Sequence, residues 1–459
     1  MSQSARQVLA DYAFMEDPFR APVANLAELQ LEAARECFAE KRQKIRVLDQ
    51  RAREVGVDEI HTLDDLVPLL FSHTSYKSYP ESFVDNGQWR NMSLWLGTLS
   101  ACSTANIANE GLETVDDWLA QVHAAGHYVF ASSGTSGKSS FMNQSDAERD
   151  LAIAACGAAT NFALGGVRPE PRFDIFTMMP AKATHKMAEF ANRYYVPFSA
   201  TGSKFYRLSD DPITAFDAMR PAQLRRLLAA GKVGPAEMAA YEATVATKQA
   251  KRAAEWDAWL DLIAEHRHNP IYAGLMWGTG YQIAEGLRAR GIRDGDFHPD
   301  TMASFGGGTK GVPLPEDFKQ QIISFFGFTP DRMADTYGMS EVNGLCGKVP
   351  GTQSYSIPPW LIPLVLDKAG EKLINPADGK GTVEGRMAFF DVTADSHWGG
   401  IISGDKVIVE FGGGIDDVRT TMVHKIARYA DLEEGEDKLT CAGSIDSYVR
   451  GSLPAAVPA

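Results

Sequence analysis

An alternation of strand, loop and helix between residues 128 and 180 is the feature that most constrains the fold. Tyr128 to Ala131 is a short apolar run that predicts a strand, and it leads into a loop of Ser, Gly and Thr. Residues 146–162 are rich in Ala with apolar positions at helical spacing, and residues 173–180 predict the next strand. Strands that alternate with helices are typical of a layered α/β sheet, so we predict an α/β fold.

Other segments extend this prediction. Residues 29–55 carry apolar positions at helical spacing among many charges, which predicts one amphipathic helix. Residues 212–268 are strongly helical, and we interpret the stripe of Trp256, Trp259, Leu260 and Ile263 as core packing rather than a cofactor site. From residue 381 onward, short β-branched and aromatic runs bounded by Gly and Asp predict a small β-rich subdomain.

Composition limits the class of function. The 459 residues carry a formal net charge of -14, which argues against a nucleic-acid partner because phosphate backbones bind basic surfaces. The sequence contains no run of 18 apolar residues and its start lacks the pattern of a signal peptide, so we expect a cytoplasmic protein without a membrane partner. The five cysteines are scattered without a C-x-x-C pair, which favours reduced structural thiols; they are Cys37, Cys102, Cys156, Cys346 and Cys441.

The loop from Ser132 to Ser139 has the composition of a phosphate site. Glycines free backbone amides to point inward, while hydroxyls and one lysine add donors and a cation. A flexible surface turn would have a similar composition. A P-loop would need Gly where Ser132 stands, so that motif is missed by one residue and a P-loop NTPase remains an alternative.

The same loop fits every position of [ST]-[ST]-G-[ST]-[ST]-G-x-[PST], the phosphate loop of adenylate-forming enzymes. Later in the chain, Thr336 to Glu341 reads T-Y-G-M-S-E, which is similar to the Y-G-x-[ST]-E segment of that family. The sequence therefore resembles the acyl-CoA synthetase and ligase superfamily, and within it phenylacetate-CoA ligase-like and acyl-protein synthetase-like members. That resemblance implies a large adenylation body with mixed sheets and packed helices.

The resemblance also implies roles for particular residues. Glu341 would hold Mg²⁺ and act in catalysis together with Thr135 and Lys138. The loop would grip the phosphates of ATP, and a Gly-rich strand end and the Tyr337 segment would shape the adenine site. These cofactor-binding positions are Ser132, Ser133, Gly134, Thr135, Ser136, Gly137, Lys138, Gly306, Gly307, Gly308, Tyr337, Gly338, Met339 and Ser340.

Two aspartates compete for the ribose role. Arg428 to Leu432 resembles the family's R-Y-x-T-G-D-L segment and would make Asp431 the ribose ligand, whereas S-G-D at residues 403–405 would assign that role to Asp405. Spacing to a hinge-like segment at residues 442–451 favours Asp431. Ser444 stands where that hinge usually has Arg.

The family's mobile lid domain would follow this hinge, but the sequence ends at Ala459. The lid normally supplies a lysine that stabilises developing charge, so we expect Lys138, Lys310 or a separate lid protein to take that role. The final acceptor stays open between coenzyme A, a carrier protein and a protein thiol that serves a reductase. Cys441 is a candidate thiol, although a structural role is favoured.

We therefore predict ATP-dependent activation of an aryl or acyl carboxylic acid to an acyl adenylate, with release of pyrophosphate. Expected divisions are an N-terminal helical segment at 1–120, the adenylate-forming core at 121–380, a β-rich subdomain at 381–451 and a tail at 452–459. The alternatives are a nucleotide-binding scaffold without catalysis and the P-loop-like NTPase. A scaffold would bind nucleotide without turning it over.

Overall fold

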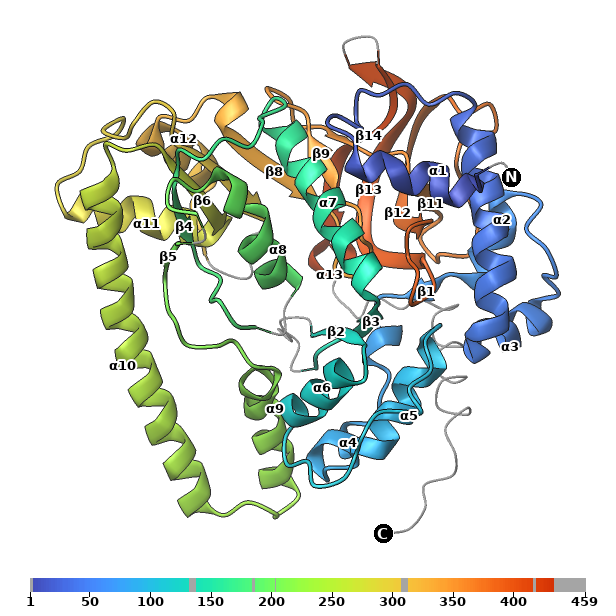
Figure 1. The fold of residues 1–459 in the computed structure, drawn as a ribbon, viewed down its shortest axis with the longest axis horizontal. Coiled ribbons are helices and arrows are strands. Elements are labelled where there is room, and N and C mark those ends of the chain that lie inside the picture. Colours follow the sequence, from blue (N-terminus) through green and yellow to red (C-terminus); the bar gives the residue numbers. More distant parts are fainter. Residues whose placement is uncertain are drawn as a thin grey trace. The chain divides into compact units, whose positions relative to one another are not determined.

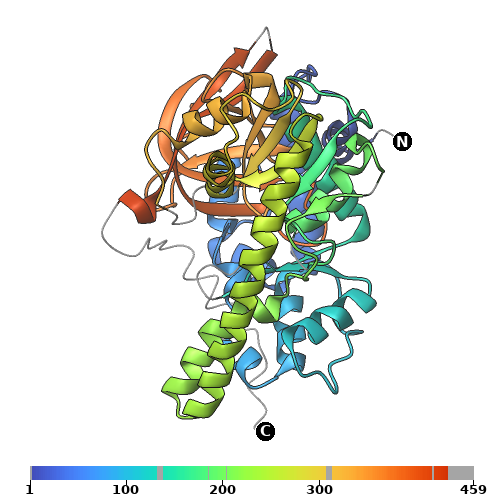
Figure 2. The same ribbon diagram turned by 90° about the vertical axis from the view of Figure 1, so that its left-hand side faces the viewer.

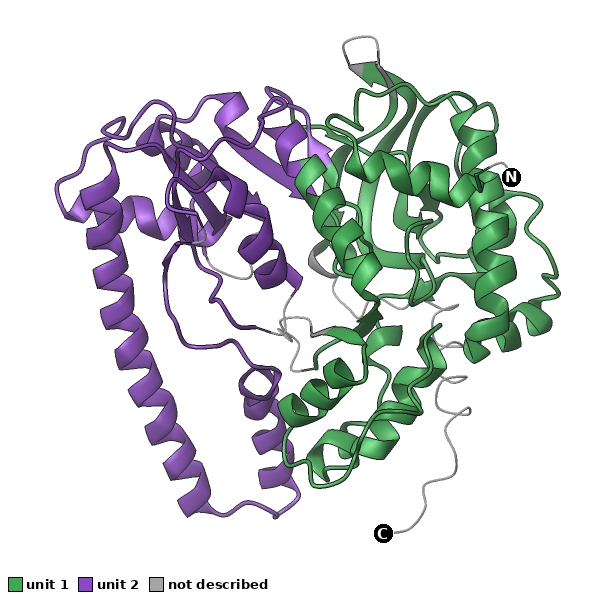
Figure 3. Cartoon of the chain, in the orientation of Figure 1, with its two compact units in different colours: residues 1–159, 338–346, 353–459 green, residues 160–337, 347–352 purple. Residues whose placement is uncertain are grey.

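The computed structural model describes residues 3–131, 138–183, 186–202, 204–306, 313–415 and 418–432. The chain divides into two compact units, coloured separately in Figure 3. Unit 1 comprises residues 1–159, 338–346 and 353–459, and unit 2 comprises residues 160–337 and 347–352. The chain thus leaves unit 1, builds unit 2, and returns directly after Tyr337.

Unit 2 is built on a sheet with helices, as the strand and helix alternation predicts. Its strand order is β5-β4-β6-β7-β8, and neighbouring strands in it run parallel. The strands are β4 (Asp174–Thr177), β5 (Tyr206–Arg207), β6 (Ile271–Met276), β7 (Met302–Gly306) and β8 (Met333–Tyr337). The helices are α8 (Lys186–Tyr194), α9 (Ala215–Ala229), α10 (Pro235–His266), α11 (Trp277–Ala289) and α12 (Phe318–Phe326).

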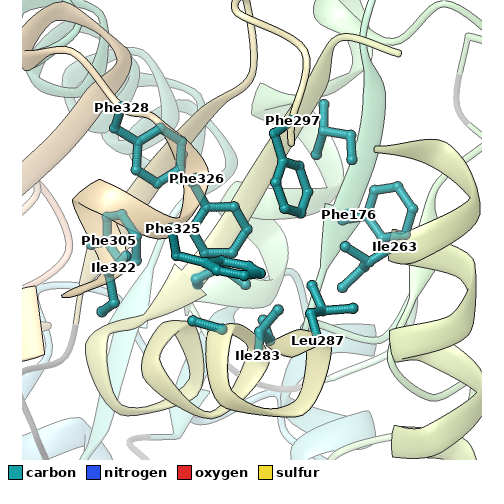
Figure 4. Packing of buried hydrophobic residues seen from close by; sticks show 14 of the residues in the cluster. Phe176, Ile263, Ile283, Leu287, Phe297, Phe305, Ile322, Phe325, Phe326 and Phe328 are labelled. Atoms are coloured by element: carbon teal, nitrogen blue, oxygen red, sulfur yellow. The ribbon is translucent and has the colours of Figure 1, made fainter. Parts of the chain in front are cut away.

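The core of unit 2 is a cluster of phenylalanines and aliphatic residues between the sheet and its helices (Figure 4). Trp259, Leu260 and Ile263 of α10 are buried in it, and Trp256 packs against it at the edge. This confirms the interpretation of the tryptophan stripe as core. Figure 2 shows the long helix α10 extending well beyond the sheet, and its buried residues lie near its C-terminal end.

Unit 1 contains the C-terminal strands, which form an antiparallel sheet in the order β11-β12-β13-β14-β10 (Figure 1). Strand β1 adds to β13 in parallel through Phe71 and Ser72. The strands are β1 (Phe71–Ser72), β10 (Tyr355–Ser356), β11 (Leu361–Leu366), β12 (Gly381–Asp391), β13 (Gly400–Ile415) and β14 (Val418–Arg428). The predicted α/β fold with a β-rich part is confirmed. Strand β9 (Cys346–Lys348) lies where the chain passes between the units.

The N-terminal helices pack on this sheet region of unit 1. Arg6 donates hydrogen bonds to the carbonyls of Val392 and Ala394, and Phe38 meets the ring of Trp398 edge-on. The helices of unit 1 are α1 (Ala5–Asp11), α2 (Leu26–Lys44), α3 (Arg46–Val55), α4 (Glu81–Asp85), α5 (Trp89–Leu99), α6 (Val115–Ala124) and α13 (Tyr429–Leu432). Helix α7 (Asp146–Ala163) begins in unit 1 and ends in unit 2.

The prediction of one helix over residues 29–55 is wrong. The segment forms α2 and α3, which are separated at Ile45, where the backbone is extended with φ -102° and ψ 102°. Buried Lys41, Ile45, Leu48 and Ala52 keep helical spacing across the break. Periodicity therefore could not show where the helix ends.

The strand before the Ser, Gly and Thr loop is confirmed, but a second strand, rather than the expected helix, follows the loop. Strand β2 (Tyr128–Ala131) pairs antiparallel with β3 (Phe141–Gln144), so the loop connects two strands of a hairpin. The expected helix begins only after β3, as α7. Within the described ranges, no helix is long and apolar enough to cross a membrane.

Candidate functional site

Several predicted site residues lie outside the described part of the chain. They are Ser132, Ser133, Gly134, Thr135, Ser136, Gly137, Gly307, Gly308, Lys310 and Cys441, together with the hinge-like segment at 442–451. The structure does place the two strands that flank the phosphate loop, the Tyr337 to Glu341 segment and both candidate ribose aspartates.

The Tyr337 to Glu341 segment starts at a strand end. Tyr337 is the last residue of β8, and the chain then turns through residues 338–346 in unit 1. At Gly338 there is no room for a side chain unless a neighbour moves, because an added Cβ would lie 2.5 Å from Leu345 Cδ2. Gly344 is equally confined, because its Cβ would lie 2.5 Å from Trp360 Nε1. The two glycines allow the turn to fold closely on its surroundings.

Asn343 anchors this turn through three partners in unit 1. Its backbone N–H donates to Asp391 Oδ2 at 2.6 Å, and its side-chain Nδ2 donates to Glu148 Oε1 at 3.0 Å. Its Oδ1 accepts from Gln144 Nε2 at 2.7 Å. Asn343 is completely buried, and the residues around it satisfy its donors and its acceptor, as a buried amide requires.

A second contact holds the turn at Glu341 itself. His397 Nε2 lies 3.3 Å from the carbonyl oxygen of Glu341, and His397 Nδ1 lies 3.4 Å from Glu148 Oε1. The Glu148 side chain is fully buried, and its Oε2 accepts a hydrogen bond from the backbone N–H of Ser396 at 2.8 Å. Glu148 on α7 thus touches both Asn343 and His397.

Tyr76 borders the same group of acidic side chains. Burial raises the pKa of the Tyr76 hydroxyl well above its usual range, and the negative charges of Glu341 and Glu148 raise it further. Its hydroxyl donates to the carbonyl of Trp398 at 3.2 Å, and its ring meets His397 edge-on. Tyr76 therefore stays a neutral hydrogen-bond donor beside two carboxylates.

The end of the phosphate loop is also placed. Lys138 Nζ donates to the carbonyl of Tyr79 and lies 4.5 Å from the centre of the Tyr79 ring. The Tyr79 hydroxyl donates to the Ser139 carbonyl at 3.0 Å, so the last two residues of the loop, Lys138 and Ser139, are both tied to Tyr79. Ser139 Oγ is buried and has no hydrogen-bond partner among the described residues.

The two candidate ribose aspartates come close together in unit 1. Asp405 on β13 pairs with Arg428 on β14, and Asp431 belongs to α13, which directly follows β14. The backbone N–H of Asp405 donates to Ser403 Oγ at 3.1 Å. The two sequence motifs therefore converge on one end of the β13 and β14 pair.

In unit 2, the strand ends near Gly306 carry an aromatic stack. Trp277, at the start of α11, stacks on Phe305 of β7 with ring centres 4.1 Å apart. Lys319 Nζ lies 4.3 Å from the centre of the Trp277 ring and 3.5 Å from Asp335 Oδ2. Ligands of parallel sheets bind at the carboxyl ends of the strands, where this stack lies.

A pocket of about 570 Å³ lies elsewhere on unit 1 and contains none of the predicted site residues. Its lining includes Lys44, Arg90, Ser100, Cys102 and Thr104. Cys37, Cys156 and Cys346 are buried, and Cys102 is partly buried, which agrees with structural thiols. In the ranges that the structure describes, no three His, Cys, Asp or Glu residues gather as metal ligands.

Sequence reasoning did not find Glu148, Asn343 or His397. Asn343 lies two residues after the Y-G-M-S-E segment, and Glu148 lies in the first turn of the predicted helix after the phosphate loop. Both are polar residues at positions that the fold buries. Nothing in the sequence marked His397 as a functional residue, since it lies far from each motif.

The geometry disagrees with a P-loop. A P-loop connects a strand to a helix whose N-terminus binds phosphate, whereas here the loop connects two antiparallel strands. Ser139 and Ser140 run into β3 rather than into a helix. The strand–loop–strand arrangement therefore argues against the P-loop-like NTPase.

No protein-family model matches the sequence, and neither does any curated protein. Solved structures do match. A 2-hydroxyisobutyryl-CoA ligase in the postadenylation state, in complex with R3-HIB-AMP, is 13% identical with a TM-score of 0.50, covering 90% of this chain and 69% of the other. An open conformation of 2-hydroxyisobutyryl-CoA ligase with 2-HIB-AMP and CoA is 12% identical with a TM-score of 0.52, covering 90% and 77%. The chain therefore has the fold of adenylate-forming enzymes.

Proposed function

We propose that this protein activates a carboxylic acid with ATP. A carboxylate oxygen would attack the α-phosphorus of ATP, the bond from that phosphorus to the bridging oxygen would break, and pyrophosphate would leave with the bonding electrons. The product would be a mixed anhydride, the acyl adenylate. The acid would be an aryl or acyl acid.

The observation that carries this proposal is the anchored Glu341 turn on a fold of this class. The Y-G-M-S-E segment starts at the end of β8, and its glutamate lies in a turn held at Asn343 by three buried hydrogen bonds. Catalysis of phosphoryl and adenylyl transfer depends on positioning, and a turn fixed in this way meets that demand. A nucleotide-binding scaffold without catalysis would not need a glutamate held in this way.

Mg²⁺ suits the oxygen donors near this turn. Glu341 offers a carboxylate, and Gln144 Oε1 is buried without a hydrogen-bond partner among the described residues. Carboxylate and amide oxygens are hard ligands of the kind that Mg²⁺ prefers. We assign Glu341 as the protein ligand, and the metal would neutralise charge on the phosphates.

The other roles follow the sequence motifs. The loop at residues 132–138 would grip the β and γ phosphates, and Gly306 to Gly308 with Tyr337 to Ser340 would border the adenine. Asp431 would bind the ribose hydroxyls, with Asp405 as the neighbouring alternative. Lys138, whose Nζ is already held by Tyr79, would act in catalysis with Thr135. The adenylate-forming core would comprise residues 121–380, and the β-rich part residues 381–451.

Coenzyme A is a candidate acceptor for the second step. One structure with this fold holds both an adenylate and CoA. A carrier protein, or a protein thiol that feeds a reductase, would serve equally well in chemical terms, because each presents a thiol that attacks the activated carbonyl and releases AMP.

The test is pyrophosphate release from ATP and Mg²⁺ across a panel of aryl and aliphatic acids, with mass spectrometry for acyl-AMP. Acid-dependent release with detection of acyl-AMP supports the proposal and identifies the substrate class. Binding of ATP without turnover for any acid would favour the scaffold. Release of orthophosphate in place of pyrophosphate would restore the NTPase alternative.

A further inference from the structure

The buried pair of Glu148 and His397 belongs to none of the recognised motifs, yet it contacts the turn that carries Glu341. We propose that Glu148 and His397 are positioning residues, which hold the Glu341 turn in the geometry that binds the metal–nucleotide complex. This inference rests on the proposed function, because that function assigns the metal to Glu341.

The first contact acts on Glu341 directly. His397 Nε2 lies 3.3 Å from the Glu341 carbonyl oxygen, so a proton on Nε2 is donated to that carbonyl. His397 is 2% exposed, and its other nitrogen lies 3.4 Å from Glu148 Oε1. The carboxylate of Glu148 thus lies beside the ring, and it holds the neighbouring backbone through Ser396.

The second contact acts two residues further on. Glu148 Oε1 also accepts from Asn343 Nδ2 at 3.0 Å, while Oε2 accepts from Ser396 N at 2.8 Å. One carboxylate therefore holds the turn at Asn343, and it also holds Ser396, the residue next to His397, which contacts Glu341. Ser396 and His397 are neighbours in the chain, so both ends of the pair are fixed to the same segment of unit 1.

The burial of this carboxylate has a cost that its partners must offset. An ionised group removed from water is strongly destabilised unless hydrogen bonds and an opposite charge compensate. A leucine at position 148 would fill the same space without that cost, so packing alone does not account for a carboxylate there. The positioning role does account for the carboxylate, since a metal ligand must be held within about 0.5 Å of the position in which it binds the metal.

The variants separate the hydrogen bond from the volume of the ring. His397→Phe keeps a ring but loses the donor, whereas His397→Gln places an amide donor near the position of Nε2. His266→Phe is the matched control, because His266 also pairs with a carboxylate, that of Asp174 at 2.8 Å, but in unit 2. Thermal melting of each full-length variant confirms that it folds.

The first readout is the gain in ATP affinity that Mg²⁺ produces, measured by calorimetry with and without the metal. We expect His397→Phe to reduce this gain about 10- to 100-fold. His397→Gln should retain most of it, and His266→Phe should leave it unchanged. If folded His397→Phe keeps the full gain, the inference is overturned while the proposed function stands.

The second readout does not depend on nucleotide chemistry. Hydrogen exchange of the amides at 339–345 should accelerate in His397→Phe and in Glu148→Gln, and remain as in the wild type in His266→Phe. Unchanged exchange in both variants would overturn the positioning role. If the wild type forms no acyl-AMP, the proposed function fails, and this readout alone decides whether the pair orders the turn.

Discussion

The imidazole Nε2 of His397 lies 3.3 Å from the carbonyl oxygen of Glu341. The two residues are separated by 56 positions in sequence, yet this contact and the Asn343 hydrogen bonds fix the turn after β8. The glutamate that the sequence motif identifies is therefore not on a free loop. Its surroundings in unit 1 were built by residues that no motif includes.

Gly338→Ala should destabilise the protein. The new Cβ would lie 2.5 Å from Leu345 Cδ2 and 3.5 Å from the Gly344 carbonyl, so the Leu345 side chain must shift. We expect a loss of about 1–3 kcal/mol in the free energy of unfolding, measured by urea denaturation.

Gly306→Ala is the matched comparison for stability. Among the described residues, its Cβ would meet no atom within 4 Å, so unfolding should change by less than about 0.5 kcal/mol. If Gly306→Ala proves as destabilising as Gly338→Ala, the packing argument for the turn is wrong.

Asp395→Asn should lower the free energy of unfolding at neutral pH, and should lower it much less in acid. Burial opposes ionisation of Asp395, but Lys41 and Arg6 outweigh it and hold the pKa of its carboxyl below the usual range. A lowered pKa contributes stability above the unfolded value, near 4, and that contribution disappears as the pH falls through the folded value.

We expect Asp395→Asn to lower the free energy of unfolding by about 1–2 kcal/mol at pH 7. The loss is no larger because the Asp395 side chain is 49% exposed, so water screens its ion pairs. Urea denaturation of the wild type and Asp395→Asn between pH 7 and pH 3 measures it. A difference between the two proteins that stays constant over this range would contradict the ion-pair account.

The buried thiols should resist alkylation in the folded state. Burial raises the pKa of Cys37 to about 12, and burial likewise raises that of Cys346, so neither forms the reactive thiolate at pH 7.5. Iodoacetamide labelling followed by peptide mass spectrometry should modify Cys102 before Cys37 and Cys346. Labelling of Cys346 as fast as Cys102 would show that the β9 region opens readily.

Local sequence patterns predicted several of the elements and the glutamate segment, but not their partners. The apolar run at Tyr128 to Ala131 gave a strand with the predicted bounds, because β-branched and aromatic residues favour extended backbone. Its antiparallel partner β3 was not foreseen, since Phe141–Gln144 is too short to show a period. The break between α2 and α3 was hidden in the same way, because the apolar stripe continues through Ile45.

The network around Glu341 could not be predicted, because it depends on tertiary contacts. Glu148 occupies the first turn of α7, where an acidic residue is ordinary in a solvent-exposed helix. Only the fold shows that this carboxylate is buried against Asn343 and His397. The two ribose candidates show the same limit, since pairing of β13 with β14, rather than sequence spacing, brings Asp405 to the segment that contains Asp431.

Acid-dependent exchange of radioactive pyrophosphate into ATP tests the central claim most directly, with the wild type and Glu341→Gln compared at saturating acid and varied Mg²⁺. We predict exchange that requires the acid in the wild type, and a loss of about 100-fold or more in the variant, with its melting temperature close to that of the wild type. Exchange that is undiminished in Glu341→Gln, or absent from the wild type with every acid tested, would contradict acid activation at this site.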